Sequence, residues 1–341
     1  MHNKNSKNSV DLNGQTVLVT GGTGSFGQRF VRLALDRYKL KKLIILSRDE
    51  HKQYAMQQST EFSGRSELRF FIGDIRDLER LHMAMRNVDL IVHAAAMKHV
   101  PTTEYNPLEC IHTNITGAEN IVNASIYCGV KRVIALSTDK AVNPINIYGA
   151  SKFAADKIFV AANRLSGDGG TKFSVVRYGN VVGSRGSIVP LIKQLIEEKA
   201  SSLPLTDERM TRFWISLDQG INFVLSSVDL MQGGEIFVPK IPSMTIKDMM
   251  ETLAPDIPQR IVGLRPGEKV HEVLISEEDT ATVLELTDRF IVCPPQAPSV
   301  QATHEEHGAK VAPAGLRYAS DNNKVWLDPQ DLKQLLPADS H

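Results

Sequence analysis

Short apolar runs, mostly of β-branched residues, alternate with longer amphipathic stretches through the first half of the chain. Near-continuous apolar strands separated by helical segments are typical of a parallel sheet that is covered on both faces. The sequence therefore predicts an α/β fold with a doubly wound parallel sheet. The runs that predict its strands are Thr16–Thr20, Lys42–Ser47, Leu68–Ile72, Leu90–Ala95, Arg132–Ser137 and Phe173–Tyr178.

This rhythm weakens after about Gly179, where proline residues punctuate shorter elements. We expect the large sheet to occupy a first domain over residues 12–179, to which residues 214–240 return. A smaller C-terminal substrate-binding lobe is expected from residues 180–213 and 241–336. The predicted domain boundary is therefore discontinuous along the chain.

Length and composition agree with two lobes. The chain has 341 residues, of which 42% are hydrophobic, and this is enough for a substantial core and more than one lobe. Residues 294–320 are rich in Pro, Ala, His and Glu, which predicts an excursion over the surface. A short final helix is expected around Asp328–Leu336.

Charge and cysteine content exclude several classes of protein. Lys plus Arg total 39 and Asp plus Glu total 39, so no net field draws the chain to nucleic acid or to an anionic membrane. Cys110, Cys128 and Cys293 lie far apart without a CxxC pair, which argues against a disulfide framework or a structural zinc site. The opening MHNKNSKNSV lacks the apolar stretch of a signal peptide, and no apolar run of about 18 residues follows. We therefore expect a cytoplasmic protein without a membrane span.

The glycine residues after the first predicted strand indicate a dinucleotide site of the Rossmann type. A strand that runs into a glycine-rich turn and then a helix lets backbone N–H groups meet a pyrophosphate. The pattern GxxGxxG is weak evidence alone, but here it directly follows the first strand and opens a helix expected from Ser25 to about Tyr38. The turn comprises Gly21, Gly22, Thr23, Gly24, Ser25, Phe26 and Gly27.

The end of the second strand predicts which dinucleotide binds. An NAD-preferring site usually has Asp or Glu there, on the ribose diol. This chain has Ser47 followed by Arg48, and a hydroxyl with a guanidinium suits a 2′-phosphate. We therefore predict NADP as the cofactor. Lys52 is a further candidate for this phosphate, and the alternative for Arg48 is a solvated loop residue.

Residues after the third and fourth strands extend the predicted cofactor site. Asp74, followed by Ile75, comes where a carboxylate can accept a hydrogen bond from the adenine amino group. Ala94, Ala95 and Ala96 follow the fourth strand, and their small side chains let the backbone pass close to the cofactor. Each feature is common alone, but their order along the chain makes them support one another.

Two short motifs carry candidate catalytic groups. Tyr148 and Lys152 form a YxxxK pair, whose spacing puts both on one helical face. A lysine ammonium beside the phenol lowers the phenol's pKa and makes Tyr148 a suitable general base. Thr138, Asp139 and Lys140 end the fifth strand, where a substrate must lie. The alternatives are a buried tyrosine with a surface lysine, and a surface Asp–Lys ion pair.

With these motifs the chain resembles the extended short-chain dehydrogenase/reductase superfamily over essentially its whole length. Five segments resemble more narrowly the C5-inverting UDP-N-acetylglucosamine 4,6-dehydratases, which open pseudaminic acid biosynthesis. These segments are SRDEHKQYAMQ, AAAMKHVPTTEYNP, STDKAVNPINIYGASK, RYGNVVGSRGS and GLRPGEKVHE. Related dehydratases of capsule pathways have methionine in place of Tyr148, and dTDP-glucose dehydratases have Asp-Glu in place of Asp139-Lys140. The 4-epimerases of the same fold lack the Asp-Lys pair.

The resemblance implies an NADP-dependent lyase acting on UDP-N-acetylglucosamine. Tyr148, assisted by Lys152, would deprotonate the C4 hydroxyl during hydride transfer, and Thr138 would orient the C4 oxygen. Lys140 would then remove the C5 proton while a protonated Asp139 donates to the departing C6 hydroxyl. Hydride return to C6 with inversion at C5 gives UDP-2-acetamido-2,6-dideoxy-β-L-arabino-hex-4-ulose, and the cofactor ends as it began.

The resemblance also implies residues for the nucleotide half of the substrate. Asn180 would meet the sugar nucleotide, and Arg212 and Arg265 would hold the diphosphate, because a guanidinium can bind two oxygens in a fork. Glu268 would reach a ribose, and Lys98 is a candidate for the sugar. The alternative for both arginines is an ordinary surface position.

Three hypotheses remain open at this point. They are the inverting dehydratase, another UDP-sugar enzyme such as a 4-epimerase or a retaining 4,6-dehydratase, and a non-catalytic NADP-binding regulator. The resemblance suggests a homo-oligomer, a hexamer or a dimer. No metal is expected, because the histidines are scattered and His304-Glu305-Glu306-His307 lacks HExxH spacing.

Overall fold

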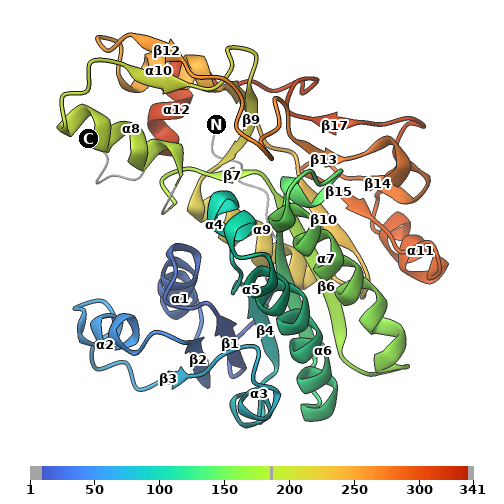
Figure 1. Ribbon diagram of the computed structural model, residues 1–341. Helices are drawn as coiled ribbons and strands as arrows, with labels where there is room; N and C mark the ends of the chain where they lie inside the picture. The colour runs from blue at the N-terminus through green and yellow to red at the C-terminus, as the bar shows by residue number, and fades with distance from the viewer. Residues whose placement is uncertain (1–9, 185–186, 337–341) are drawn as a thin grey trace.

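The computed structural model describes residues 10–184 and 187–336, and a large sheet lies at its centre (Figure 1). Among these residues, ten strands form this sheet in the order β16-β14-β15-β10-β6-β5-β4-β1-β2-β3. The neighbours from β3 to β10 pair in parallel, so the predicted parallel sheet is confirmed. Its strands are β1 (Thr16–Thr20), β2 (Lys42–Ser47), β3 (Leu68–Ile72), β4 (Leu90–His93), β5 (Arg132–Thr138), β6 (Lys172–Tyr178), β10 (Ile236–Pro239), β14 (Val283–Glu285), β15 (Arg289–Val292) and β16 (Lys310–Val311).

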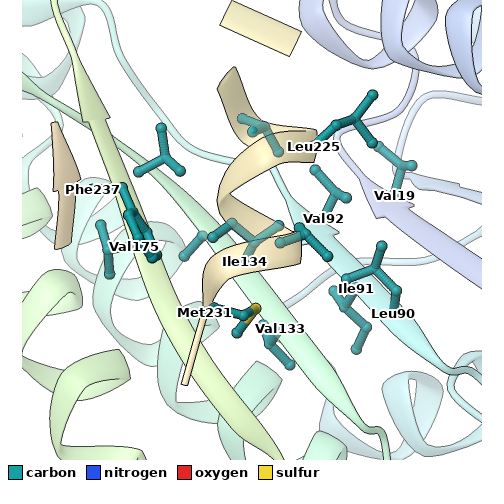
Figure 2. Packing of buried hydrophobic residues seen from close by; sticks show 14 of the residues in the cluster. Val19, Leu90, Ile91, Val92, Val133, Ile134, Val175, Leu225, Met231 and Phe237 are labelled. Carbon is teal, nitrogen blue, oxygen red and sulfur yellow. The ribbon is translucent and has the colours of Figure 1, made fainter. Parts of the chain in front are cut away.

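Helices cover both faces of the sheet, as a parallel sheet requires. On one face α1 contacts α9, and on the other α6 contacts both α3 and α7 (Figure 1). Figure 2 shows Leu225 of α9 and Met231 packed over apolar side chains from β1, β4, β5, β6 and β10. The helices of this part are α1 (Ser25–Arg37), α2 (Glu50–Gln58), α3 (Leu78–Ala84), α4 (Val100–Tyr105), α5 (Pro107–Ile111), α6 (Gly117–Cys128), α7 (Ile147–Ser166) and α9 (Leu217–Leu230), with a π-helical turn η1 (His112–Thr116).

A second, smaller core lies above the carboxyl ends of the parallel strands (Figure 1). It is built around the fully buried Trp214 and Met249, and Leu332 of the final helix closes it. Residues 217–239 leave this lobe, since α9 covers the large sheet and β10 pairs with β6. The elements of the smaller lobe are β7 (Asn180–Val181), α8 (Ile188–Glu197), β8 (Leu203–Leu205), β9 (Thr211–Ile215), β11 (Ser243–Thr245), α10 (Ile246–Leu253), β12 (Gln259–Ile261) and α12 (Pro329–Leu335).

The structure differs from the expected boundary of the second lobe at residues 283–311. Strands β15, β14 and β16 add in antiparallel pairs to β10 and so belong to the large sheet. Residues 294–320, expected to form a surface excursion, include α11 (Pro298–Glu306), an otherwise exposed or partly exposed helix that carries one buried side chain, His304. Further short elements are β13 (Val273–Ile275), the 3-10 turns η2 (Asp139–Ala141) and η3 (Glu277–Thr282), and β17 (Tyr318–Ala319).

A buried carboxylate explains why α11 packs against the sheet. Glu235, just before β10, is 0% exposed and lies 3.0 Å from His304 Nε2. It also accepts hydrogen bonds from the Ser174 hydroxyl at 2.6 Å and the Gly233 N–H at 2.8 Å. Burial opposes its charge, but the hydrogen bonds from His304 and Ser174 lower the pKa of Glu235 below its ordinary value. Acidic side chains and histidines are commonly exposed, but here Glu235 and His304 form a buried anchor that holds α11 to the sheet.

Replacing Glu235 with Ala should destabilise the protein by about 3–5 kcal/mol, because several buried donors lose their acceptor. The free energy of unfolding from urea titrations at neutral pH measures this loss. Since the folded pKa is depressed, the parent's extra stability should be lost as pH falls through that pKa. Glu285→Ala is the control, because this half-exposed partner of Lys240 should contribute at most about 1 kcal/mol. Equal losses in the two variants would contradict the anchor.

Candidate active site

A cleft of about 1060 Å³ opens at the carboxyl ends of the parallel strands, where the large sheet faces the second lobe. Parallel strands point the same way, so the turns that follow β1, β2, β4, β5 and β6 all reach this edge. The residues that the sequence predicts for the site line this cleft, with the exceptions of Gly22 and Asp139. Residues from the second lobe, such as Met210 and Met250, form the opposite wall.

One end of the cleft is built to receive an anion at the start of α1. The N-cap Gly24 makes no side-chain capping bond, and the first turn of α1 holds no acidic residue. First-turn N–H groups therefore stay available, and the helix dipole favours a negative charge there. A Cβ on Gly27 would lie 2.4 Å from the Gly22 Cα, and one on Gly21 would lie 2.9 Å from the Ala95 nitrogen. The residues present fit a dinucleotide pyrophosphate.

A buried threonine and histidine hold the next part of the wall. The Thr20 hydroxyl lies 2.8 Å from His93 Nδ1 and accepts the N–H groups of Ala94 and Ala95, each at 3.2 Å. Burial lowers the pKa of His93 to about 3, so the ring is neutral at physiological pH. This network fixes the backbone where Ala94, Ala95 and Ala96 line the cleft.

The predicted cofactor-selecting residues lie together at the ends of β2 and β3. The Arg48 guanidinium is more than half exposed and lies 3.8 Å from the Asp74 carboxylate. Asp74 is also bound by Arg76 at 2.8 Å, and this hydrogen bond outweighs partial burial and lowers its pKa. Ser47 and Lys52 line the same stretch, although Lys52 is paired with Asp49 at 2.9 Å. Arg48 therefore keeps the freedom to meet a further anion.

Helix α7 brings Tyr148 and Lys152 to the cleft on one face, as their spacing predicts. The Lys152 ammonium donates to the Leu136 carbonyl at 2.7 Å. Burial raises the pKa of Tyr148 to about 12, while the Lys140 charge and a hydrogen bond with Thr138 oppose that rise. The expectation that Lys152 lowers this pKa is therefore replaced, because Lys140 is the lysine whose charge acts most on the phenol. Burial also lowers the pKa of Lys152.

Thr138, Asp139 and Lys140 lie where β5 passes into η2. The Asp139 carboxylate is 0% exposed and does not line the cleft. Its Oδ1 accepts from the Thr138 hydroxyl at 2.9 Å and from Lys140 Nζ at 3.0 Å. Asp139 therefore lies behind Thr138 and Lys140, which line the cleft, and its role as proton donor stays a prediction.

Glu272 is a cleft residue that the sequence argument did not single out. It lines the cleft although it is only 2% exposed, and its Oε1 lies 3.1 Å from Lys140 Nζ. Burial opposes the charge on Lys140, but the carboxylates of Asp139 and Glu272 raise its pKa well above the ordinary value. The sequence feature that could have indicated Glu272 is the segment GLRPGEKVHE, in which Glu272 follows Glu268 by four residues.

The Arg212 guanidinium is buried and already hydrogen-bonded to the protein, so it does not stand open to bind a phosphate group. It is 5% exposed and donates to the Thr211, Val270 and Lys269 carbonyls at 2.7, 3.0 and 2.9 Å. Its Nε lies 3.8 Å from Glu272. Most of its donors therefore hold residues 269–272 against β9.

Arg265 and Glu268 lie on the loop that leads into this segment. Arg265 is exposed at the cleft, and its guanidinium has no hydrogen bond or ion pair within residues 10–184 and 187–336. The loop is tied to the start of α7, because Asn146 donates to the Gly267 carbonyl at 2.8 Å. Asn180 and Lys98 line the cleft nearby. The structure thus brings the predicted nucleotide-binding groups to the same cleft as the catalytic groups.

Within residues 10–184 and 187–336, no group of three or more His, Cys, Asp or Glu side chains is placed to hold a metal ion. Every described helix is too short or too polar to cross a lipid bilayer.

Comparison with known sequences agrees with this geometry. Residues 17–294 match the family described as polysaccharide biosynthesis protein. The UDP-N-acetylglucosamine 4,6-dehydratase (inverting) of Campylobacter jejuni is 51% identical over 335 residues, which cover 95% of this chain and 98% of the relative. A UDP-glucose 4-epimerase of Rickettsia akari is 39% identical, covering 94% and 95% of the two chains.

Solved structures show the same architecture. The X-ray structure of Pen from Bacillus thuringiensis has a TM-score of 0.86 at 35% identity, and the match covers 96% of this chain and 98% of that one. A dTDP-glucose 4,6-dehydratase from Streptomyces venezuelae, solved with NAD bound, has a TM-score of 0.64 at 26% identity, covering 75% and 87% of the two chains.

Two helical glycines give a matched test of the dinucleotide site. Gly27→Ala should weaken cofactor binding by at least about tenfold, since the added methyl collides with the Gly22 backbone and displaces the turn. Gly220→Ala, in α9, adds its methyl where no atom lies within 4 Å and should leave binding unchanged. Fluorescence titration of the reduced cofactor measures both. Equal affinities for the two variants would show that the turn does not contact the cofactor.

Proposed function

The chain belongs to the polysaccharide biosynthesis protein family, with the fold of the extended short-chain dehydrogenases/reductases, and on this basis we propose that it is a C5-inverting UDP-N-acetylglucosamine 4,6-dehydratase. The product is UDP-2-acetamido-2,6-dideoxy-β-L-arabino-hex-4-ulose, a precursor for pseudaminic acid. The inverting dehydratase relative, similar over nearly the full length of both chains, supports this substrate and outcome.

The observation that carries the proposal is the meeting of two catalytic groups on one cleft wall. Tyr148 and Lys152 serve oxidation at a sugar carbon, while Lys140 stands beside two carboxylates that serve proton transfer. A 4-epimerase requires only the first group, because it returns the hydride to the carbon from which it came. Loss of water from C5 and C6 requires both a base and an acid. The presence of Lys140 with its two carboxylates therefore favours a dehydratase over a 4-epimerase.

Tyr148 takes the proton of the C4 hydroxyl in the first step. A bound nicotinamide cofactor supplies the hydride acceptor at C4 and the hydride donor at C6. Thr138 hydrogen-bonds Tyr148 and orients the C4 oxygen, and the Lys140 charge stabilises the phenolate form in which Tyr148 can accept this proton. The Lys152 ammonium is held by its hydrogen bond to the Leu136 carbonyl. It orients the cofactor ribose and the face of α7 that carries Tyr148.

Lys140 removes the C5 proton once the C4 carbonyl has made it acidic. At rest Lys140 is an ammonium between Asp139 and Glu272, so it must first pass a proton to one of these carboxylates. The carboxyl group thus formed is a suitable acid for the departing C6 hydroxyl. A proton shared within this cluster therefore prepares the base and the acid together.

The nicotinamide cofactor proposed here is NADP. The exposed Arg48 beside Ser47 supports this choice, because a guanidinium binds a 2′-phosphate in a fork. Asp74, ionised by its pairing with Arg76, lies where it can accept from the adenine amino group. The Streptomyces venezuelae dehydratase was solved with NAD bound, so the proposed preference for NADP has to be tested by measuring the affinity for both dinucleotides.

The diphosphate is proposed to bind Arg265, whose guanidinium stands open at the cleft. Glu268 serves the ribose, and Asn180 and Lys98 contact the sugar nucleotide. Arg212 contributes its charge while its donors hold the neighbouring backbone.

A homo-oligomeric, cytoplasmic enzyme is part of the same proposal. The three cysteines are free thiols, which suits a reducing compartment.

Arg48→Ala should weaken NADP binding by about 1.5–3 kcal/mol, the usual size of a hydrogen bond to a charged group, and should change NAD binding little. Competitive titration with both dinucleotides measures the two affinities. Lys157→Ala, which replaces a cation of α7 outside the cleft, is the control for general charge loss. Equal losses for NADP and NAD would remove Arg48 from the 2′-phosphate site.

The central experiment follows the product of UDP-N-acetylglucosamine by NMR, where C5 inversion changes the ring couplings. Tyr148→Phe should abolish the first hydride transfer, so that no transient absorbance of reduced cofactor appears. Lys140→Met should still oxidise C4 but should accumulate the 4-keto sugar without C5 deuterium from solvent. A simple C4 epimer as the product of the parent protein would refute the dehydratase, and C5 exchange at the parent rate in Lys140→Met would transfer the base role elsewhere.

A further inference from the structure

Three ionisable side chains lie about one turn apart on the inner face of α7. Tyr148 and Lys152 line the cleft, and Asp156 follows Lys152 by four residues, the spacing that places two side chains on one face of a helix. Asp156 is only 2% exposed and is not among the residues that line the cleft. Any effect of Asp156 on the reaction must therefore pass through its neighbours.

Two of these side chains fasten α7 to the end of β5. Lys152 Nζ donates to the Leu136 carbonyl at 2.7 Å, and the Ser137 hydroxyl donates to Asp156 Oδ2 at 2.9 Å. Leu136 and Ser137 are consecutive residues, and both line the cleft. The two hydrogen bonds therefore hold the catalytic face of α7 against the strand that ends in Thr138.

A buried arginine extends this connection to the next strand and beyond. Arg177 is the register partner of Ser137 on β6, is 4% exposed, and lies 3.3 Å from the same oxygen of Asp156. Its Nη1 donates to the Leu274 carbonyl of β13 at 3.0 Å. Because β13 directly follows Glu272, the Asp156–Arg177 pair links α7 to the segment that reaches the cleft from the other side. Desolvation largely offsets the attraction within a buried ion pair, so stability alone does not account for this one.

The groups that face Lys152 show what the Asp156 charge does. Burial lowers the pKa of Lys152, and the Asp156 carboxylate opposes this fall more than the Cys110 thiol of α5 does. Burial raises the pKa of that thiol, lowers the pKa of His93 on β4 to about 3 and raises the pKa of Tyr148 to about 12, so these three groups are neutral at physiological pH. Of the groups around Lys152, Asp156 supplies the negative charge.

We propose that Asp156 is a positioning residue for the oxidation at C4, which holds α7 against β5 and supplies the counter-charge of the Lys152 ammonium. Lys152 in its charged form orients the cofactor ribose and keeps its hydrogen bond at the cleft wall beside Tyr148. Without the carboxylate, the buried amine would lose its proton more readily. This role rests on the hydride transfer of the function proposed above, a step that a dehydratase shares with a 4-epimerase.

Asp156→Asn removes the charge but keeps the size of the side chain. Stopped-flow absorbance of the reduced cofactor, after mixing with UDP-N-acetylglucosamine at a series of pH values, measures the rate of the first hydride transfer. In the parent protein this rate should fall at alkaline pH, as the Lys152 ammonium loses its proton. In the variant the fall should begin about one pH unit lower or more, because a nearby opposite charge shifts a pKa by that much. A residue with only a structural role would lower the rate at every pH without moving this fall.

A second measurement needs neither cofactor nor turnover. In protein labelled with 13C-lysine, the NMR signal of Lys152 is identified by its absence in Lys152→Met, and its pH titration gives the pKa directly. This pKa should be lower in Asp156→Asn than in the parent protein by the same shift as the alkaline fall in rate.

Three further variants separate charge from shape. Asp156→Glu keeps the charge and should keep the parent's alkaline fall, even where the longer stem lowers the rate. Asp168→Asn removes the same charge from an exposed position just after α7 and should match the parent in both measurements. The double variant Asp156→Asn/Arg177→Met serves if the single variant folds poorly, since it removes both partners of the buried pair. It should show the same downward shift for Lys152.

An unshifted Lys152 titration in Asp156→Asn, or in the double variant, would overturn the proposal. An equal shift in Asp156→Glu or in Asp168→Asn would do so as well. The identity of the product is a separate outcome: a C4 epimer from the parent protein would reject the dehydratase, whereas a downward shift in Asp156→Asn would still support Asp156 in the oxidation.

Discussion

Strand direction is the constraint on which the rest of this molecule depends. Parallel strands can be joined only by crossovers, and these crossovers become the helices that cover both faces of the sheet. As a consequence the carboxyl ends of β1, β4, β5 and β6 meet at one edge. Gly21, Ala94, Thr138 and Asn180, far apart in sequence, therefore share one cleft. The second lobe has only to lie across this edge to complete an active site.

The charge cluster at Lys140 joins the two halves of the molecule electrostatically. A buried ammonium needs partners, and Lys140 takes one from its own strand end and one from the segment that Arg212 holds against the second lobe. The carboxylates of Asp139 and Glu272 outweigh burial and raise the pKa of Lys140, so they favour its charged form. Acid and base strengths at this site are thus properties of the cluster rather than of one side chain.

This cluster also explains how one scaffold serves several reactions. The nucleotide cradle and the Tyr–Lys pair suit any reversible oxidation of a sugar hydroxyl, and relatives of this chain include both dehydratases and 4-epimerases. What a dehydratase needs in addition is a base for C5 and an acid for C6, close enough to share a proton. The fold alone does not provide these groups. The groups proposed for them are Lys140 and its two carboxylates, at the end of β5 and in the segment before β13.

The sequence by itself determined the strands of the parallel sheet, because short apolar β-branched runs that alternate with amphipathic helical stretches favour a sheet covered on both faces. It also determined the glycine turn and the Tyr148–Lys152 pair, since both depend on spacing within one element. Only the tertiary structure decided the rest. Contacts between residues far apart in the chain set the pairing of Glu235 with His304, the hydrogen bonds of Arg212 and the burial of Asp139. For the same reason Glu272 emerged only from the fold: its distance from Lys140 is set by how the second lobe meets the sheet, and no local pattern encodes that distance.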